Sequence, residues 1–133
     1  MKIKKIDKFL IYVNIILFIY YAFQLLVFTD EFAIKNIGLF NHAIAGLSEI
    51  LGIIFFSLSL GLTIILFKGI DNQLPLFITI LLLQFFISLN FWRYILTDSP
   101  GETDIKTILI NALIFTICSF ITFVLFTRNK FTL

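Results

Sequence analysis

The sequence has little of what a soluble or disulfide-stabilised protein needs. Only 14% of the residues are charged and 60% are hydrophobic, whereas about 25% are charged in an average soluble domain. The single cysteine, Cys118, cannot form an intramolecular disulfide and is expected to be a small buried hydrophobic residue. No complete catalytic, nucleotide-binding or metal-binding signature is present, and no folded domain offers a basic face for nucleic acid.

Long uncharged apolar runs occupy most of the chain instead. They cover residues 9–28, 50–67, 74–92 and 107–127, and each is close to the roughly 20 residues with which an α-helix crosses a bilayer. The sequence therefore predicts an all-α integral membrane protein, folded as an antiparallel four-helix transmembrane bundle. We expect one domain over residues 1–133, with spans at about 9–28, 47–67, 74–96 and 105–127.

The distribution of basic residues predicts the orientation. In a bundle that alternates direction, one side receives Lys2, Lys4, Lys5, Lys8, Lys68, Arg128 and Lys130, and the other receives Lys35, Arg93 and Lys106. Because cytoplasmic loops are enriched in Lys and Arg, both termini are expected in the cytoplasm. The first apolar run is longer than a signal-peptide core and lacks a small-x-small cleavage site, so we expect it to remain in the mature protein.

The connecting segments carry recognisable turn and helix signals. Pro75 suits the first turn of the third span, where its missing amide hydrogen would be unpaired anyway. Residues 99–102 (SPGE) match a capping box and predict that the last helix begins near Pro100. Residues 29–41 form the only long loop, which is half apolar. We expect it to lie along the outer interface or to form a lid over the bundle.

Polar side chains near the outer ends of the spans are the candidate binding residues. They are Gln24, His42, Glu49, Asn90, Arg93 and Asn111. One interpretation is a polar pocket in which Glu49 and Arg93 form a partly buried ion pair and His42 can titrate or donate to a ligand. The other is that Glu49 and Arg93 reach water at the interface and only mark the helix ends. Neither a catalytic nor a metal-ligating set is predicted.

Fewer polar groups lie deeper in the spans. Asn14 and Gln84 are expected to form hydrogen bonds between helices. Small residues at four-residue spacing favour close helix packing, as does a small, weakly polar stripe on the last span. The small residues are the pairs Ser48 with Gly52 and Ser57 with Gly61. The stripe on the last span consists of Thr107, Asn111, Cys118 and Thr122. No charged row crosses a span, so an ion-conduction path is not predicted.

One stretch of the second span resembles a known family. Residues 45–52 (AGLSEILG), followed by an apolar run to Gly61, are similar to the second-helix signature of the DoxX-like small four-helix membrane proteins, a glutamate followed by two aliphatic residues and glycine. The match covers residues 45–61, and only Gly46, Glu49 and Gly52 correspond to the motif. The resemblance implies a bacterial inner (plasma) membrane protein, with some relatives linked to quinone or sulfur redox complexes.

Two classes of function fit these features. The first is a binding or accessory subunit that holds an apolar, lipid-like or quinone-like ligand, or that docks to a larger membrane complex. The second is an intramembrane enzyme that uses His42 and Glu49 as acid and base on a lipid-like substrate. We favour the first, since no partner that would orient His42 or Glu49 is visible. The expected partners are the bilayer, an apolar ligand, and a membrane protein or second copy of the chain, without cofactor or nucleic acid.

Overall fold

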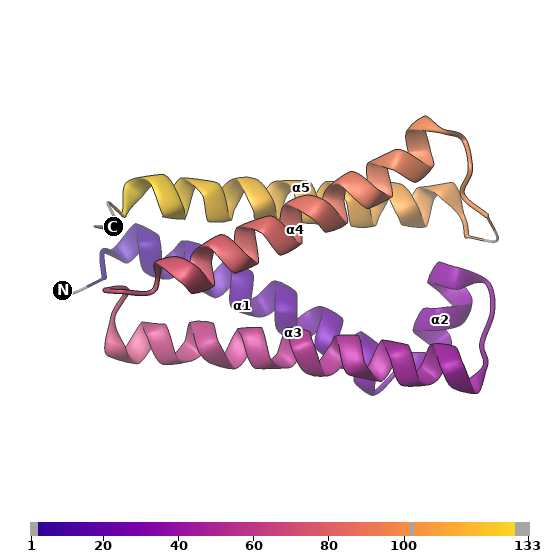
Figure 1. Ribbon diagram of the computed structural model, residues 1–133, viewed down its shortest axis with the longest axis horizontal. Helices are drawn as coiled ribbons and strands as arrows, with labels where there is room; N and C mark the ends of the chain where they lie inside the picture. Colours follow the sequence, from indigo (N-terminus) through magenta and orange to yellow (C-terminus); the bar gives the residue numbers. More distant parts are fainter. Residues whose placement is uncertain (1–2, 102, 130–133) are drawn as a thin grey trace.

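The long apolar runs form the predicted membrane-type helices. The computed structural model describes residues 3–101 and 103–129, which exclude Lys2, Glu102 and Lys130, and over these residues it is helical without strands (Figure 1). The helices are α1 (Lys5–Leu26), α2 (Thr29–Ile37), α3 (His42–Lys68), α4 (Leu74–Leu96) and α5 (Ile105–Arg128). All except α2 are long and apolar enough to span a membrane. The all-α antiparallel fold is therefore confirmed.

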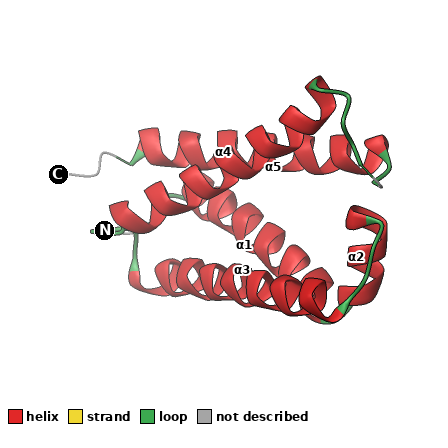
Figure 2. Cartoon of the chain, turned by 45° about the vertical axis from the view of Figure 1, so that its right-hand side comes forward, coloured by secondary structure: helices red, strands yellow, loops and turns green. Residues whose placement is uncertain are grey.

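The four long helices form two pairs rather than a square bundle. Helix α1 packs along α3, α4 packs along α5, and α1 against α5 joins the two pairs. Although α3 and α4 are consecutive, they contact each other little and diverge from their connecting turn (Figures 1 and 2). We call the end where α1 begins and α5 finishes the terminal end, and the opposite end, where α2 lies, the α2 end.

Small residues on α3 allow its close approach to α1. Ser48 and Gly52 are buried, as their spacing predicts. A Cβ added to Gly52 would lie 2.7 Å from Leu26 Cγ of α1, so the two backbones meet at this glycine. The second small residue pair behaves differently, because Ser57 is exposed and donates to the Ile53 carbonyl of its own helix at 2.8 Å. Ser57 follows Gly52 by five residues, about 140° around the helix, and so faces away from α1.

Helix α1 covers Lys5–Leu26 and not the predicted 9–28, and two further helix starts also differ from the sequence prediction. Helix α3 begins at His42, because the Asn41 side chain caps it by accepting the Ile44 amide hydrogen at 2.9 Å. Helix α5 begins at Ile105, so the predicted start near Pro100 is wrong. The reason is that the Ser99 amide donates to the Tyr94 carbonyl at 3.1 Å and terminates α4. Pro75 does lie in the first turn of α4.

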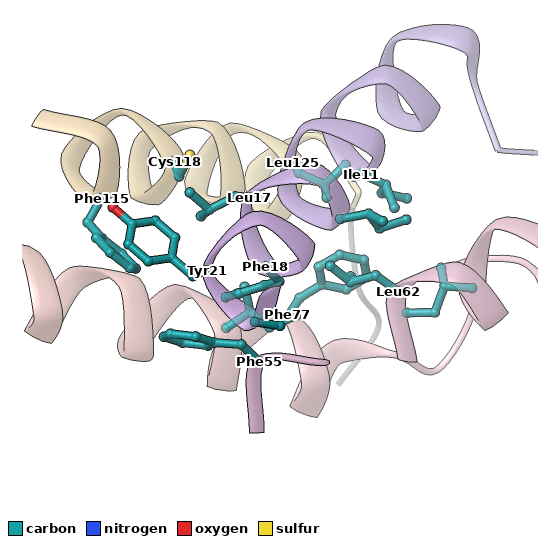
Figure 3. Packing of buried hydrophobic residues seen from close by; sticks show 14 of the residues in the cluster. Ile11, Leu17, Phe18, Tyr21, Phe55, Leu62, Phe77, Phe115, Cys118 and Leu125 are labelled. Carbon is teal, nitrogen blue, oxygen red and sulfur yellow. The ribbon is translucent and has the colours of Figure 1, made fainter. Parts of the chain in front are cut away.

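An aromatic cluster at mid-depth connects both helix pairs. The ring centroids of Phe18 and Phe55 are 5.6 Å apart, and those of Tyr21 and Phe115 are 5.0 Å apart (Figure 3). Phe91 of α4 adds a contact to Phe115 at 6.1 Å. Lipid tails are as apolar as these side chains, so the cluster stabilises the fold by close packing rather than by removal from water.

A buried polar triad links α1, α4 and α5 on the terminal side of this cluster. Gln84 Nε2 donates to Asn14 Oδ1 at 2.6 Å, which confirms that these amides bond between helices. The Thr122 hydroxyl lies 2.7 Å from Gln84 Oε1 and 3.0 Å from Asn14 Oδ1. All three side chains are buried. Satisfied polar groups of this kind hold membrane helices together, because the alternative is an unpaired group in hydrocarbon.

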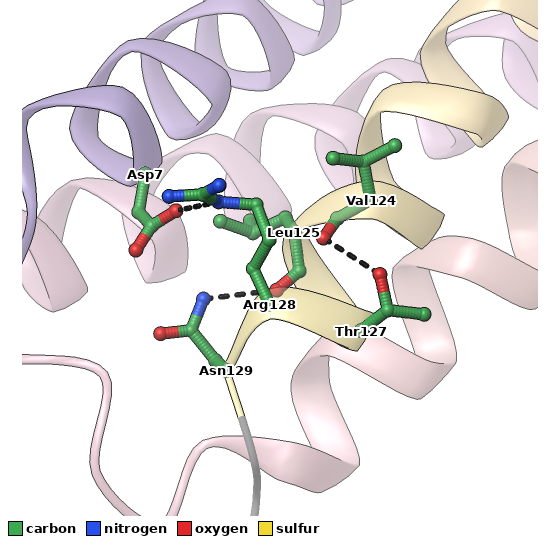
Figure 4. Close-up of polar contacts among 6 residues, drawn as sticks. All are labelled: Asp7, Val124, Leu125, Thr127, Arg128 and Asn129. Atoms are coloured by element: carbon green, nitrogen blue, oxygen red, sulfur yellow. Dashed lines mark hydrogen bonds and ion pairs between the residues drawn. The ribbon is translucent and has the colours of Figure 1, made fainter.

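An ion pair closes the terminal end. Arg128 Nε of α5 donates to Asp7 Oδ1 of α1 at 2.8 Å (Figure 4). Asp7 is only 2% exposed, whereas Arg128 is 35% exposed. The sequence places both residues on one side of the membrane but does not show that they meet. The pair joins the first and last helices, which are far apart in the sequence.

Replacing Arg128 with glutamine is expected to lower the free energy of unfolding in detergent by about 1–2 kcal/mol. The change leaves Asp7 buried without a cation, a situation that costs about 3–5 kcal/mol when both partners are fully buried. Water around the half-exposed guanidinium reduces that figure. Lys8→Gln, which removes an exposed cation from the same end, is the control. A loss of stability in Lys8→Gln as large as that in Arg128→Gln would contradict a specific pair.

Candidate functional site

A polar cavity lies between α1, α2 and α5 at the α2 end. Its volume is about 210 Å³. The wall combines amide, hydroxyl and phenol groups with three apolar side chains and one charge of each sign. The lining residues are Tyr20, Tyr21, Gln24, Glu31, Phe32, Lys35, Asn36, Thr107, Ile110, Asn111 and Ile114.

The α2 segment forms one wall of the cavity because specific contacts define both of its ends. The Thr29 hydroxyl donates to the Leu25 carbonyl at 2.6 Å, directly after α1. Gly38 ends the helix in the left-handed conformation, with φ of 77°, which a glycine adopts readily. The helix runs across the end of the bundle, beside α1, α3 and α5 (Figures 1 and 2). The half-apolar segment therefore lies over the bundle as a short lid.

A chain of hydrogen bonds holds α2 against α1 and α5. The Tyr21 hydroxyl donates to Asn111 Oδ1 at 2.5 Å, and Asn111 Nδ2 donates to Asn36 Oδ1 at 3.0 Å. Asn36 Nδ2 in turn donates to the Phe32 carbonyl at 2.9 Å. The Thr103 hydroxyl also donates to the Asn36 backbone carbonyl. These bonds define the cavity wall and engage the polar groups of Tyr21, Asn36 and Asn111.

Gln24 differs from these residues because its amide is free. Its side chain is half-buried and lines the cavity. It has no hydrogen-bond partner within residues 3–101 and 103–129. A primary amide carries two donor hydrogens and an acceptor oxygen. Gln24 can therefore offer a ligand both a donor and an acceptor.

The structure separates the six candidate residues into two groups. Gln24 and Asn111 line the same cavity. His42, Glu49, Asn90 and Arg93 are exposed and lie outside it.

The ion pair between Glu49 and Arg93, which one of the two interpretations predicted, is not formed within the described part of the chain. The Arg93 guanidinium instead lies 4.8 Å from the centre of the Tyr94 ring. Glu49 is on α3 and Arg93 on α4, and these helices diverge toward the α2 end (Figure 2). His42 and Glu49 do share one face of α3, as their seven-residue spacing predicts, but that face is exposed.

Most of the cavity wall was not predictable from the sequence. Tyr20 and Tyr21 lie one helical turn before Gln24, on the same stretch of α1. The segment that contains Glu31 and Lys35 is predicted as a loop from the sequence, whereas it forms the helix α2 in the structure. The feature that could have predicted this wall is the polar side of the half-apolar segment, because a short amphipathic helix presents its polar residues together.

A second cavity lies beside the first and shares Asn36 with it. Its volume is about 300 Å³, and it lies between the end of α2, the end of α4 and the α4–α5 connection. Among residues 3–101 and 103–129, its wall holds hydroxyl groups, aromatic rings and no charged side chain. The lining residues are Asn36, Ile37, Phe91, Tyr94, Ser99, Pro100, Gly101, Thr103 and Ile108.

These features define the class of the protein. It is a small all-helical protein with four helices suited to crossing a membrane, and it has a polar cavity at one end of the bundle. No protein-family model, curated protein or solved structure matches the chain. The resemblance to the DoxX-like proteins around Glu49 therefore stays a prediction.

Proposed function

We propose that this protein is a membrane-embedded binding or accessory subunit that holds the polar head of a lipid-like or quinone-like molecule in the α1–α2–α5 cavity. The observation that carries the proposal is the composition of the cavity wall. The free amide of Gln24 and the hydroxyl of Thr107 lie beside the apolar side chains of Ile110 and Ile114. An amphipathic molecule offers groups that match both kinds of surface.

The cavity size indicates how such a ligand would lie. Pockets that enclose a complete drug-sized ligand measure about 300–1,000 Å³, whereas this cavity measures about 210 Å³. It therefore has room for a head group and not for an acyl or isoprenoid tail. Tyr20 and Ile110 line the cavity and are 55% and 57% exposed, so the tail would pass along them into the surrounding lipid.

The distribution of basic residues supports an orientation of the cavity in the membrane. With Lys5, Lys8, Lys68 and Arg128 at the terminal end, the excess of basic residues supports a cytoplasmic terminal end. The cavity would then lie in the outer leaflet of a bacterial plasma membrane. The alternative of an intramembrane enzyme stays a prediction. We do not favour it, because His42 and Glu49 are exposed on α3 and neither lines the cavity.

Replacing Gln24 with leucine is expected to reduce the ligand that remains bound during purification about three- to tenfold. The substitution removes a hydrogen-bonding amide of similar size, and one hydrogen bond contributes about 0.5–1.5 kcal/mol. Native mass spectrometry of the protein in mild detergent, with lipid extraction in parallel, measures the bound fraction. Asn90→Leu is the matched control, since it replaces an exposed amide outside the cavity.

Two experimental outcomes would contradict ligand binding in this cavity. One is a wild-type protein that carries no lipid or quinone above the proportion found in the bulk membrane. The other is equal ligand loss in Gln24→Leu and Asn90→Leu, which would place the ligand elsewhere on the bundle.

A further inference from the structure

The cavity contains one acidic and one basic side chain, and both belong to α2. Glu31 and Lys35 are four residues apart, so they project from one side of the helix about one turn apart. Within the described residues they form no ion pair with each other or with another side chain. Both are exposed at the cavity wall. Each therefore has its charge available for a ligand.

Among the residues that the structure describes, the rest of the cavity wall is uncharged. The polar groups that α1 and α5 contribute are amides, phenols and the Thr107 hydroxyl. Two other charged residues lie close along the chain, Asp30 and Lys106, and both are exposed without lining the cavity. The described part of the site thus offers one cation and one anion, separated by a helical turn, whose charges sum to zero.

Charge complementarity distinguishes between lipid head groups. A neutral head, such as a glycerol or a quinone ring, leaves both charges without a partner. An anionic head satisfies Lys35 but places its charge near Glu31. A head with one phosphate and one ammonium group satisfies both, through charge-assisted hydrogen bonds that are about twice as strong as neutral ones.

We propose that the ligand is a zwitterionic phospholipid whose phosphate binds Lys35 and whose ammonium group binds Glu31. This inference rests on the proposed function, because it specifies the head group that the α1–α2–α5 cavity accepts. The position of α2 at the end of the spans places the two charges at head-group depth. The glycerol of the lipid fixes the phosphate nearer to the tail, so the order of the two charges on α2 determines which way the head group can bind.

The test compares head groups in the full-length protein. The protein is purified in mild detergent, supplied with equal amounts of phosphatidylethanolamine, phosphatidylglycerol and diacylglycerol with the same acyl chains, and examined by native mass spectrometry. Phosphatidylethanolamine should be retained about two- to fivefold more than either competitor, since ion pairs with exposed side chains such as Glu31 and Lys35 are weakened by water.

Substitutions on α2 show whether the two charges cause this preference. Glu31→Gln and Lys35→Gln should each reduce phosphatidylethanolamine binding about two- to fivefold. Asp30→Asn, which removes an exposed carboxylate from the same helical turn without altering the cavity wall, should leave it unchanged. The double variant Glu31→Lys/Lys35→Glu keeps the wall neutral but reverses the charge order, and it should bind as weakly as the single variants. Circular dichroism and thermal unfolding without added lipid verify that each variant is folded.

Failure of this inference can be separated from failure of the proposed function. Equal retention of phosphatidylethanolamine and phosphatidylglycerol, or an Asp30→Asn effect equal to that of Glu31→Gln, overturns the zwitterion assignment while lipid binding survives. No retention of any lipid by the wild-type protein overturns the proposed function as well. Competition by soluble glycerophosphoethanolamine that is as effective as the intact phospholipid would show that the site takes a free phosphodiester, which also overturns the proposal of a membrane lipid.

Discussion

Replacing Gln84 with leucine is expected to lower the free energy of unfolding by about 1–2 kcal/mol. The change removes the bond from Gln84 Nε2 to Asn14 Oδ1 and the contact of Gln84 Oε1 with the Thr122 hydroxyl. Asn14 Oδ1 and the Thr122 hydroxyl stay buried and keep their mutual contact at 3.0 Å, so the cost is that of the lost hydrogen bonds, each of which contributes about 0.5–1.5 kcal/mol. Hydrogen bonds between membrane helices average about 0.6 kcal/mol and reach about 1.7 kcal/mol, which limits the expected loss.

Two controls distinguish the triad from a general effect of substitution. Asn90→Leu removes an exposed amide from the same helix and should change stability by no more than about 0.5 kcal/mol. The triple variant Asn14→Leu/Gln84→Leu/Thr122→Val leaves no triad member polar and should lose less stability than the sum of the three single variants, because each single variant already breaks bonds that the other two share. Thermal or denaturant unfolding in one detergent measures all the variants. Additive losses in the triple variant would contradict the triad as a unit.

Replacing Gly52 with alanine is expected to destabilise the α1–α3 contact by about 1–3 kcal/mol. The added methyl group would lie 2.7 Å from Leu26 Cγ and 3.0 Å from Leu25 Cβ. Leu25 Cβ is attached directly to the backbone, so a side-chain rotation cannot relieve that contact and the helices must separate. Overpacking of this kind typically costs about 1–3 kcal/mol.

Gly46 provides a matched control for this prediction. It lies in the same helix, and an added Cβ would have no heavy atom within 4 Å. Gly46→Ala should therefore be neutral, or stabilising by up to about 1 kcal/mol through the higher helix propensity of alanine. Unfolding in detergent and the amount of monodisperse protein recovered from the membrane measure both variants. Equal behaviour of the two alanine variants would show that α1 and α3 do not meet at Gly52.

Parts of the fold that depend on local properties were predictable from the sequence. The four spans follow from apolar composition and length, since an apolar stretch of about 20 residues has no comparable alternative in a bilayer. Helix boundaries were less predictable. The sequence at Ser99 has the capping-box pattern, but the Ser99 amide donates to the end of α4 and does not start α5. A short motif does not show that two neighbouring helices can compete for the same residue.

The candidate site was predicted only in part for a related reason. The depth of Gln24 and Asn111 could be inferred from their positions along the spans, and both line the cavity. Depth does not specify which helices are neighbours, however. Glu49 and Arg93 lie near the same end of α3 and α4, but those helices diverge, so no ion pair forms. Glu31 and Lys35 became part of the wall only because the short connecting segment forms a helix against α1 and α5.

The amino-acid sequence by itself determined that the chain is helical, that its long helices suit a membrane, and that polar residues concentrate toward one end. Those properties depend on the hydrophobicity and spacing of residues close together in the chain. Only the tertiary structure decided that α1 stands between α3 and α5, that Asp7 meets Arg128, and that α2 completes a cavity. The physical reason is that all four long helices present similar apolar surfaces, so their arrangement depends on a few close contacts and hydrogen bonds between distant residues.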